Sequence, residues 1–237
     1  MEVLGKQVID AKAVTKDYRR GEIVIPAVRG IDMAVEEGEF TAIVGPSGSG
    51  KTTFLNLVSG LDSPTAGEIW LRGKLISQMT GNELSDYRRD HLGFVFQAYN
   101  LIPVLNVEEN VEYVMMLQGV PKQERHERVS AILERMGLAD FHDRMPTNLS
   151  GGQQQRVAIA RAMVSRPALI LADEPTANLD SETSESLLEM MRDLNSETGM
   201  TFLFSTHDQR VVDKARRVVV LEDGKVVRDE VREGVRQ

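Results

Sequence analysis

The sequence predicts an α/β fold with a mainly parallel central sheet, an antiparallel β part added to it and a helical part inserted into it. Three observations predict this fold. Short apolar runs alternate with helical patterns, a glycine-rich loop joins one such run to a helix, and the β pattern disappears between about residues 98 and 165. Alternation of this kind is typical of sheets whose parallel strands bind ligands at their carboxyl ends.

The central strands are predicted from short, mostly apolar runs, because a parallel strand is buried on both faces of its sheet. Helical patterns lie between these runs. The helix expected over 51–61 has apolar residues at Phe54, Leu57, Val58 and Leu61, and another helix is expected over 181–198. The predicted strands are 39–44 (EFTAIV), 92–96 (LGFVF), 168–173 (ALILAD), 201–206 (TFLFST) and 217–223 (RVVVLED).

The remaining segments follow other patterns. About the first forty residues and 67–73 (GEIWLRG) are expected to form antiparallel strands, whereas 121–137 (PKQERHERVSAILERMG) has the pattern of a charged amphipathic helix. We therefore expect a single domain. It would span 1–237, with the α/β core and antiparallel part at about 1–97 and 166–230, and the helical part at about 98–165.

Composition narrows the classes of protein. The chain has 237 residues, 27% of them charged, a formal net charge of -8 and no cysteine. The acidic balance argues against binding nucleic acid by bulk electrostatics, and no basic cluster favours direct binding to anionic lipid. The missing cysteines exclude disulfides and cysteine zinc sites. With no apolar run long enough to cross a bilayer and no secretory leader, we expect a cytoplasmic chain.

The segment Gly45–Thr52 (GPSGSGKT) has the spacing G-x-x-x-x-G-K-T, after a predicted strand and at the start of a predicted helix. In this context the loop's N–H groups surround phosphates at the positive end of the helix. Lys51 adds a mobile positive charge, and the Thr52 hydroxyl can bind Mg²⁺. The chain is therefore predicted to bind a nucleoside triphosphate. The expected binding residues are Gly45, Pro46, Ser47, Gly48, Ser49, Gly50, Lys51, Thr52 and Thr53.

Two adjacent carboxylates end the strand predicted over 168–173. Asp173 is expected to hold Mg²⁺, as acidic residues do on the neighbouring strand of such NTPases. Glu174 follows it and would lie near the γ-phosphate, where a carboxylate can polarise an attacking water. Because one acid can serve the metal and the other the water, the pair favours hydrolysis over binding alone. Two solvated acids at a strand end are the ordinary alternative.

Three single residues fit around this centre. Gln97 follows a predicted strand and could reach Mg²⁺ or the attacking water with its amide. His207 follows another strand and can donate a hydrogen bond to the γ-phosphate. Tyr18 could stack on the adenine ring. Each also has an ordinary structural interpretation, as a surface amide, a structural imidazole and a packed aromatic ring.

Taken together with LSGGQ at Leu149–Gln153, these motifs resemble the ATP-binding cassette (ABC) ATPases over nearly the full length of the chain. GPSGSGKT resembles their Walker A loop, and LILADE resembles their Walker B strand. The resemblance puts Gln97 at the Q-loop, His207 at the switch histidine and Tyr18 at the adenine-stacking position. It puts 177–180 (ANLD) at the D-loop, which here begins with alanine in place of the usual serine but keeps Asp180.

The resemblance implies ATP and Mg²⁺ as cofactors, with Thr52, Gln97 and Asp173 around the metal, and Glu174, His207, Gln97 and Lys51 as catalytic residues. It also implies that two cassettes pair head-to-tail, so that each nucleotide lies between the Walker A loop of one copy and the signature motif of the other. The residues expected to reach the partner's ATP are Ser150, Gly151, Gly152, Gln153 and Asp180.

The sequence favours a transporter motor over two other classes, a soluble ABC-type ATPase acting on ribosomes or DNA and a simple P-loop kinase. Only one cassette is present, sustained heptads and cysteine are missing, and a kinase would not need LSGGQ. The segments at 96–111, 172–181 and 202–208 resemble the lipoprotein-releasing (LolD) and macrolide-exporter (MacB) group. A small-solute importer remains the alternative.

The resemblance further implies transmembrane permease subunits as partners, which would be the cassette's only contact with the membrane, and no nucleic acid. It implies a peripheral location on the cytoplasmic face of the inner membrane of a bacterium. Residues 98–113 include Leu101 and Leu105 just after Gln97, more apolar residues than a free surface loop needs. We expect part of this segment to line a groove for a cytoplasmic helix of the permease, with packing into the helical core as the alternative.

Overall fold

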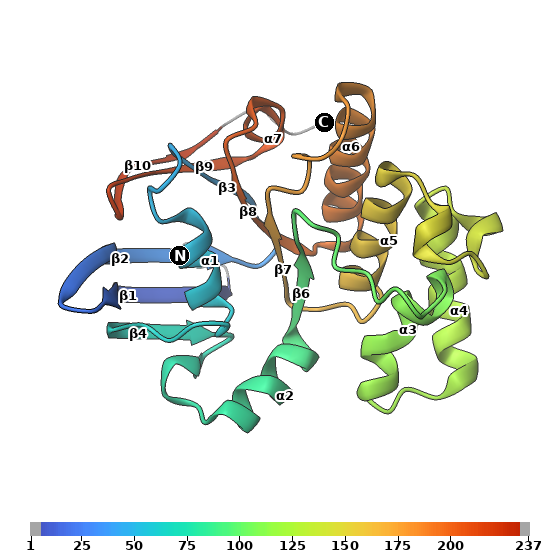
Figure 1. The fold of residues 1–237 in the computed structure, drawn as a ribbon, viewed down its shortest axis with the longest axis horizontal. Coiled ribbons are helices and arrows are strands. Elements are labelled where there is room, and N and C mark those ends of the chain that lie inside the picture. The colour runs from blue at the N-terminus through green and yellow to red at the C-terminus, as the bar shows by residue number, and fades with distance from the viewer. Residues whose placement is uncertain (1–5, 233–237) are drawn as a thin grey trace, which may run out of the picture.

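The computed structural model describes residues 6–232, and its largest element is a six-stranded sheet (Figure 1). The strand order is β10-β9-β3-β8-β7-β6. All neighbouring strands pair in parallel except β10, which is antiparallel to β9. The predicted parallel sheet is confirmed, with single-residue differences at strand ends. Its strands are β3 (Phe40–Val44), β6 (Leu92–Val95), β7 (Leu169–Asp173), β8 (Thr201–Thr206), β9 (Arg217–Glu222) and β10 (Lys225–Val231).

The middle of this sheet is buried on both faces, as its apolar runs predict. Phe40 on β3 packs against Phe202 and Phe204 on β8, with ring centroids 5.4 and 4.6 Å apart. All three side chains are fully buried. Because the strands are parallel and in register, their carboxyl ends meet along one edge of the sheet.

The second sheet is antiparallel, with the order β2-β1-β4-β5. Its strands are β1 (Gln7–Arg20), β2 (Ile23–Glu36), β4 (Ala66–Leu71) and β5 (Lys74–Leu75). The expected antiparallel strands near the N-terminus and around 67–73 are thus confirmed. Helix α1 (Lys51–Val58) contributes Phe54 and Leu57 to the core that this sheet shares with the larger one.

Two helical predictions need correction. Helix α1 ends at Val58, earlier than the predicted 61, because the chain turns at Gly60, where φ is 67°. Helix α2 (Gly81–His91) was not predicted. It is strongly polar and buries only Tyr87 among its residues, so it lacks an apolar period. Its sequence signal is the capping box that Thr80 and Glu83 form at its start.

The chain between β6 and β7 contains helices and no strand, as predicted for residues 98–165. Figure 1 shows these helices gathered on the side opposite the antiparallel sheet. Helix α5 passes from this group to the core, where it packs against β6. The helices are α3 (Val107–Leu117), α4 (Lys122–Arg135) and α5 (Gly151–Met163), followed after β7 by α6 (Ser181–Thr198) and α7 (Gln209–Lys214).

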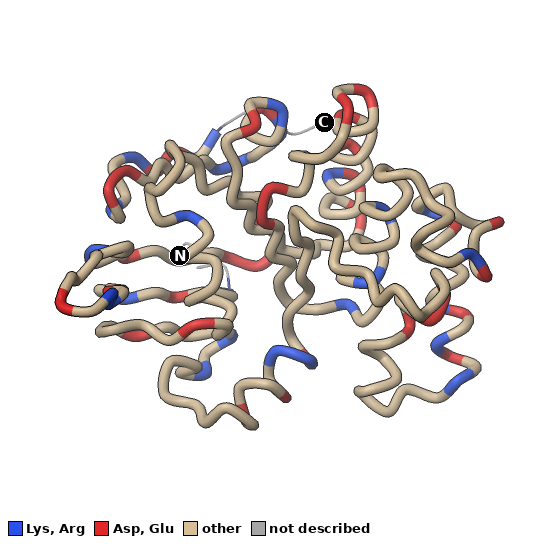
Figure 2. Tube along the Cα trace, viewed as in Figure 1, with Lys and Arg blue, Asp and Glu red and all other residues tan. Residues whose placement is uncertain are grey.

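Charged residues are distributed over all parts of the fold, with Lys and Arg interspersed among Asp and Glu (Figure 2). Among the helices of residues 6–232, none combines the length and the apolar composition that crossing a membrane requires.

Candidate active site

An open cleft of 700 Å³ lies at the carboxyl ends of the parallel strands. Most of the glycine-rich loop at 45–53 lines it, facing Gln97, Glu174 and His207. These residues come from the ends of β3, β6, β7 and β8, four separate parts of the sequence. The fold therefore brings together the loop and three of the predicted catalytic side chains.

The start of α1 is open toward the cleft. Its N-cap is Gly50, with φ at 100°, and neither a side-chain cap nor an acidic residue occupies the first turn. A Cβ atom at Gly50 would lie 2.5 Å from the Ala27 carbonyl oxygen, so the close approach of β2 requires glycine. Free N–H groups at the positive end of a helix form an anion site. Lys51 Nζ donates to the carbonyl oxygens of Gly45 and Pro46, at 2.8 and 3.1 Å, which holds the ammonium inside the loop.

Oxygen ligands suited to Mg²⁺ adjoin the loop. The Thr52 hydroxyl donates to Asp173 Oδ1 at 3.1 Å, so the first turn of α1 and the end of β7 meet as predicted. A hydroxyl and a carboxylate match the hard oxygen donors that Mg²⁺ prefers, with water and phosphate completing its octahedron. The residues present therefore fit this metal.

Glu174 is held rigidly beside this pair. Its backbone lies in the left-handed region, with φ at 48°, a conformation that costs energy in a residue other than glycine. Its carboxylate accepts a hydrogen bond from Thr206 Oγ1 at 3.0 Å and pairs with His207 Nδ1 at 2.7 Å. The imidazole is 74% exposed, so the Glu174–His207 pair borders the cleft and remains open to it.

Two contacts that sequence reasoning missed hold the loop after β6. Asn178 donates to the Gln97 carbonyl at 2.8 Å, and Arg161 of α5 donates to the carbonyls of Asn100 at 2.7 Å and Tyr99 at 3.0 Å. Burial lowers the pKa of Arg161. Their acceptors are main-chain oxygens far away in sequence, so no residue pattern indicates these contacts.

A third missed group stabilises the turn after His207. The Asp208 carboxylate accepts hydrogen bonds from Thr176 at 2.7 Å and from the side chain and backbone of Arg210. Burial on its own would raise the pKa of Asp208, but these hydrogen bonds outweigh it and lower the pKa to about 2. The segments that carry Glu174 and His207 are thereby joined a second time.

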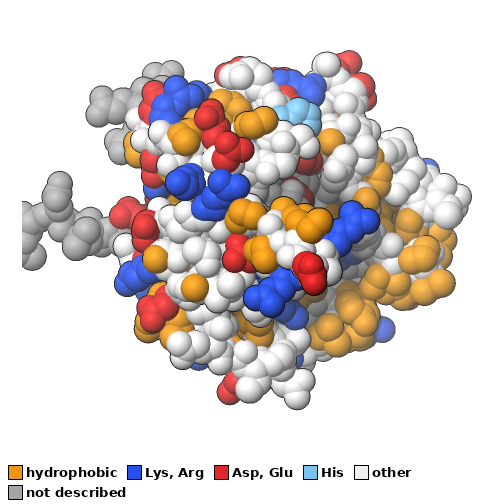
Figure 3. All heavy atoms as spheres, turned by 60° about the vertical axis from the view of Figure 1, so that its left-hand side comes forward, with side chains coloured by type: hydrophobic (Ala, Val, Ile, Leu, Met, Phe, Trp, Pro, Cys, Tyr) orange, Lys and Arg blue, Asp and Glu red, His pale blue; other side chains and the backbone are white. Residues whose placement is uncertain are grey.

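Tyr18 lies on β1, outside the residues that line the cleft. Its hydroxyl donates to Asp62 at 2.9 Å, and Lys16 Nζ lies 5.1 Å from the ring centroid. Partial burial raises the pKa of its hydroxyl, and the residue as a whole remains 40% exposed. On the next strand of the hairpin, Ile23, Val24 and Ile25 are also exposed. Figure 3 brings forward the side of the molecule on which β1 and β2 lie, and hydrophobic side chains are visible on this face.

The second glycine-rich segment forms a separate cavity of 420 Å³, which shares no lining residue with the cleft. Ser150 caps α5, and its side chain and that of Gln153 form a reciprocal capping box. A Cβ atom at Gly152 would lie 2.7 Å from Thr183 Cγ2, so glycine permits close packing against α6. Asp180 caps α6 by accepting from the Thr183 N–H at 2.9 Å.

Comparison with known families agrees with this arrangement. The family model described as ABC transporter matches residues 28–177, which run from β2 to the first residue of the D-loop and include both glycine-rich segments. The chain belongs to the ABC transporter family.

Relatives of this cassette include both separate proteins and parts of longer ones. An uncharacterized ABC transporter ATP-binding protein of Thermotoga maritima is 46% identical over 221 residues, covering 93% of this chain and 94% of that protein. A macrolide export ATP-binding/permease protein, MacB, of Syntrophobacter fumaroxidans is also 46% identical. That match covers 91% of this chain but only 30% of MacB. The cassette therefore corresponds to about a third of MacB.

The structure also matches solved cassettes. The dimeric structure of MJ0796, a protein of Methanocaldococcus jannaschii, is 43% identical and superposes with a TM-score of 0.88. The match covers 95% of this chain and 99% of that one. A second dimeric structure of MJ0796, in a post-hydrolysis state, is bound to ADP and phosphate. The fold of this chain is that of an ABC ATPase, and the chain is an ATPase that uses ATP and Mg²⁺.

Proposed function

We propose that the cassette is the ATP-hydrolysing subunit of a transporter and that two copies pair head-to-tail around two ATP molecules. ATP binding would close the dimer and hydrolysis would open it, moving separate transmembrane subunits. Relatives named as macrolide exporters support an exporter over an importer. A lipoprotein-releasing complex is proposed from the resemblance at 96–111, 172–181 and 202–208. The cassette would then lie on the cytoplasmic face of a bacterial inner membrane, held there by its permease.

In this proposal, each copy supplies all the catalytic residues of one nucleotide site, and the other copy supplies the signature motif. The glycine-rich loop binds the triphosphate through its N–H groups, and Lys51 turns from its two carbonyl acceptors to the phosphates. Bound Mg²⁺, held by Thr52 and Asp173 with Gln97 nearby, would neutralise phosphate charge. Glu174 accepts a proton from the attacking water, and Tyr18 stacks on adenine through its exposed ring.

The His207 ring has two functions in this half-site. Its Nδ1 pairs with Glu174 and fixes the carboxylate that polarises water. Its other nitrogen is then available to donate to the γ-phosphate, because the side chain is largely exposed beside the cleft. The double contact of Glu174, with Thr206 and His207, supports a carboxylate that is oriented before the nucleotide binds.

The observation that best supports the proposed dimer is that the two glycine-rich helix starts lie in separate cavities of one copy. The α5 cavity contains Ser150, Gly151 and Gly152 but no Walker lysine and no paired carboxylate of its own. Its small residues and helix N-terminus suit contact with a γ-phosphate held by another copy. Gln153 and Asp180, which support the caps of α5 and α6, would line the same contact.

A groove of 340 Å³ between β6, α3 and α5 is the proposed docking site for a cytoplasmic helix of the permease. Leu61, Phe94 and Val114 give it an apolar lining, with Arg88 and Arg161 beside them. Leu101, part of the segment expected to line such a groove, packs against the buried helical core instead. Arg161 connects the groove to the loop that follows Gln97, because its side chain donates to the carbonyls of Tyr99 and Asn100.

Co-purification tests this docking. Leu61→Glu and Val114→Glu place a charge in the groove and should weaken recovery of the permease with the cassette, while ATP binding stays unchanged. Val231→Glu is the matched control, because Val231 is 72% exposed on β10, away from the groove. Full recovery of the permease with both groove variants would contradict the proposal.

A further inference from the structure

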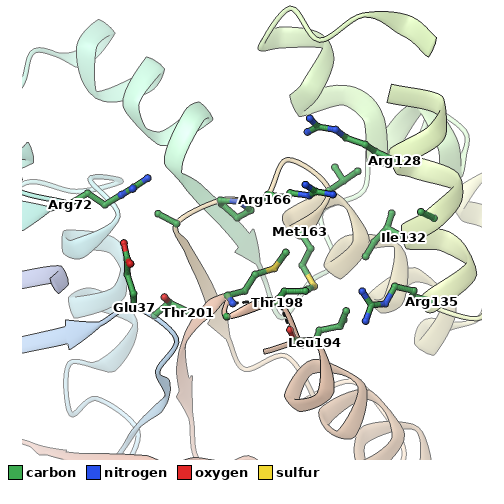
Figure 4. Close-up of a pocket in the computed structure, with 16 residues that line it drawn as sticks. Glu37, Arg72, Arg128, Ile132, Arg135, Met163, Arg166, Leu194, Thr198 and Thr201 are labelled. Carbon is green, nitrogen blue, oxygen red and sulfur yellow. Dashed lines mark hydrogen bonds between the residues drawn. The ribbon is translucent and has the colours of Figure 1, made fainter. Parts of the chain in front are cut away.

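A further cavity, of 540 Å³, lies at the opposite ends of the strands from the catalytic cleft. Its lining includes Ala168, just before β7, and Thr201, the first residue of β8. The catalytic residues lie at the other ends of the same strands. Helix α4 forms the facing wall (Figure 4). Its volume lies within the range of about 300–1,000 Å³ that is usual for small-molecule sites. No step of ATP hydrolysis uses this cavity.

The cavity combines cationic side chains with an apolar floor. Four arginines and one carboxylate, Glu37, line it, in a chain whose formal net charge is -8. Figure 4 shows Arg128 and Arg135 extending from α4 and Arg166 lying between them and Arg72. The floor is made of Ile132, Met163, Leu194 and Met200, all of which are part of the helical core or packed against it.

The arginines retain hydrogen-bond donors for a ligand. Among residues 6–232, neither Arg72 nor Arg166 forms a side-chain hydrogen bond or ion pair. Arg128 pairs with Glu124, and Arg135 pairs with Glu197. Both of these acids lie outside the cavity lining and are exposed, and exposed ion pairs stabilise a fold little. Since a guanidinium has five N–H donors, both paired arginines can also bind an anion.

Helices α5 and α6 end at this cavity, and their carboxyl ends carry partial negative charge. Some of the last-turn carbonyls are nevertheless occupied. The Met163 oxygen accepts from the Arg166 N–H, and the Asn195 oxygen accepts from the Gly199 N–H. The guanidinium groups, by contrast, add full positive charges and several free donors for an anion.

We propose that this cavity binds a small amphipathic anion, a carboxylate or phosphate joined to an apolar body. The anionic group would bind Arg166 together with Arg128, and the apolar body would cover Ile132 and Met200. Such a ligand would contact α4 and the starts of β7 and β8 at once, joining the helical part to the strands that carry Asp173 and His207. Its binding would not depend on the transport function or on the nucleotide site.

Calorimetric titration with decanoate tests the site, with butyrate as an anion of short chain and decanol as an uncharged counterpart. Decanoate should bind the wild-type protein saturably and more tightly than either. Arg166→Gln should weaken decanoate binding about tenfold or more, because a charge-assisted hydrogen bond is lost. Ala131→Phe, at an exposed lining position, should block the cavity. Arg228→Gln on exposed β10 is the matched control and should bind like the wild type.

Lys51→Ala separates this site from the nucleotide cleft and should retain decanoate binding. Loss of binding in Lys51→Ala would mean that the probe occupies the cleft, which overturns the proposal. It is equally overturned if wild type shows no saturable binding, if decanol binds as tightly as decanoate, or if Arg166→Gln and Ala131→Phe bind decanoate like wild type.

Discussion

The starts of α1 and α5 look alike in sequence and differ in structure. Both follow glycine and serine residues, yet α1 begins at a left-handed Gly50 without a side-chain cap, while α5 begins at Ser150 inside a complete capping box. The first helix leaves its N–H groups for a ligand and is surrounded by Lys51, Glu174 and His207. The second satisfies part of its own terminus and has no catalytic group beside it. The start of α1 is therefore built as an anion site, whereas the start of α5 is proposed to contact the nucleotide of another copy.

The largest effect on turnover is expected at Glu174, the proposed general base, which lies beside the start of α1 and has no counterpart beside α5. Glu174→Gln keeps the side-chain shape but removes the negative charge and basicity. Turnover should fall by roughly 10²–10⁴-fold, the usual contribution of general-base catalysis. ATP binding should persist, because one carboxylate no longer repels the triphosphate. Steady-state phosphate release and equilibrium ATP binding would measure the two effects, and undiminished turnover would remove Glu174 from the proposed role.

The next effect concerns nucleotide affinity. Lys51→Ala removes the ammonium that the loop holds at Gly45 and Pro46, and ATP affinity should fall by roughly 30-fold or more. His207→Ala should retain most of the affinity and lose turnover, because its contacts are with Glu174 and the γ-phosphate. Fluorescence titration with a labelled ATP distinguishes them. Equal loss of affinity in both variants would contradict the assigned roles.

A smaller effect on turnover is expected when Arg161, which joins α5 to the loop after Gln97, is replaced. Arg161→Met keeps an apolar stem on α5 but removes the donors to the carbonyls of Tyr99 and Asn100, which follow Gln97. Turnover should drop about tenfold while ATP affinity stays near wild type, because Gln97 is misplaced and Lys51 is not. If affinity falls as much as turnover, Arg161 supports the fold in general and does not position Gln97.

The smallest expected effect is on stability, and it involves residues of the helical part only. Glu108 on α3 pairs with His126 and His142, at 2.7 and 2.8 Å. Burial would raise the pKa of Glu108, but the hydrogen bonds from the two histidines outweigh it and lower the pKa below its ordinary value of 4.5. The Glu108 carboxylate in turn raises the pKa of His126 above 6.5.

These shifts set a pH window. The stability that His126 gains from this pair is fully present below pH 6.5 and is lost as pH rises through its raised pKa. The stability that Glu108 gains is fully present above pH 4.5 and is lost as pH falls through its lowered pKa. Glu108→Gln should therefore destabilise the protein more at about pH 5.5 than at about pH 8.5, as measured by urea unfolding. A difference between variant and wild type that does not change with pH would rule out the charged pairs.

Sequence patterns predicted the central sheet and the residues of the cleft because their signals are local. The strand over 201–206 is a continuous apolar run, and the loop at 45–52 has a fixed spacing before a helix. Helix α2 was missed because Tyr87 is its only buried residue, which leaves no apolar period. The Thr80–Glu83 capping box is present in the sequence, but a cap without an apolar period does not by itself predict a helix.

The supporting contacts of the site could not be predicted, for a different reason. Arg161 and Asn178 bind main-chain carbonyls of residues 97–100, and any residue type presents the same carbonyl. Leu101 illustrates the same limit, since an apolar residue after Gln97 fits a partner groove as well as a core. Only the tertiary fold decides between the two, and it packs Leu101 inward.

The shared nucleotide site is tested most directly by the size of the protein in ATP, measured by analytical ultracentrifugation in the Glu174→Gln background. We predict a dimer with ATP and a monomer without it. Adding Ser150→Arg should abolish the dimer while each copy still binds ATP. Ser150→Ala, which loses the same helix cap at a cost of about 1 kcal/mol without adding bulk, should still dimerise with ATP. An ATP-dependent dimer that persists with Ser150→Arg would contradict the account, because LSGGQ would then not contact the nucleotide of the other copy.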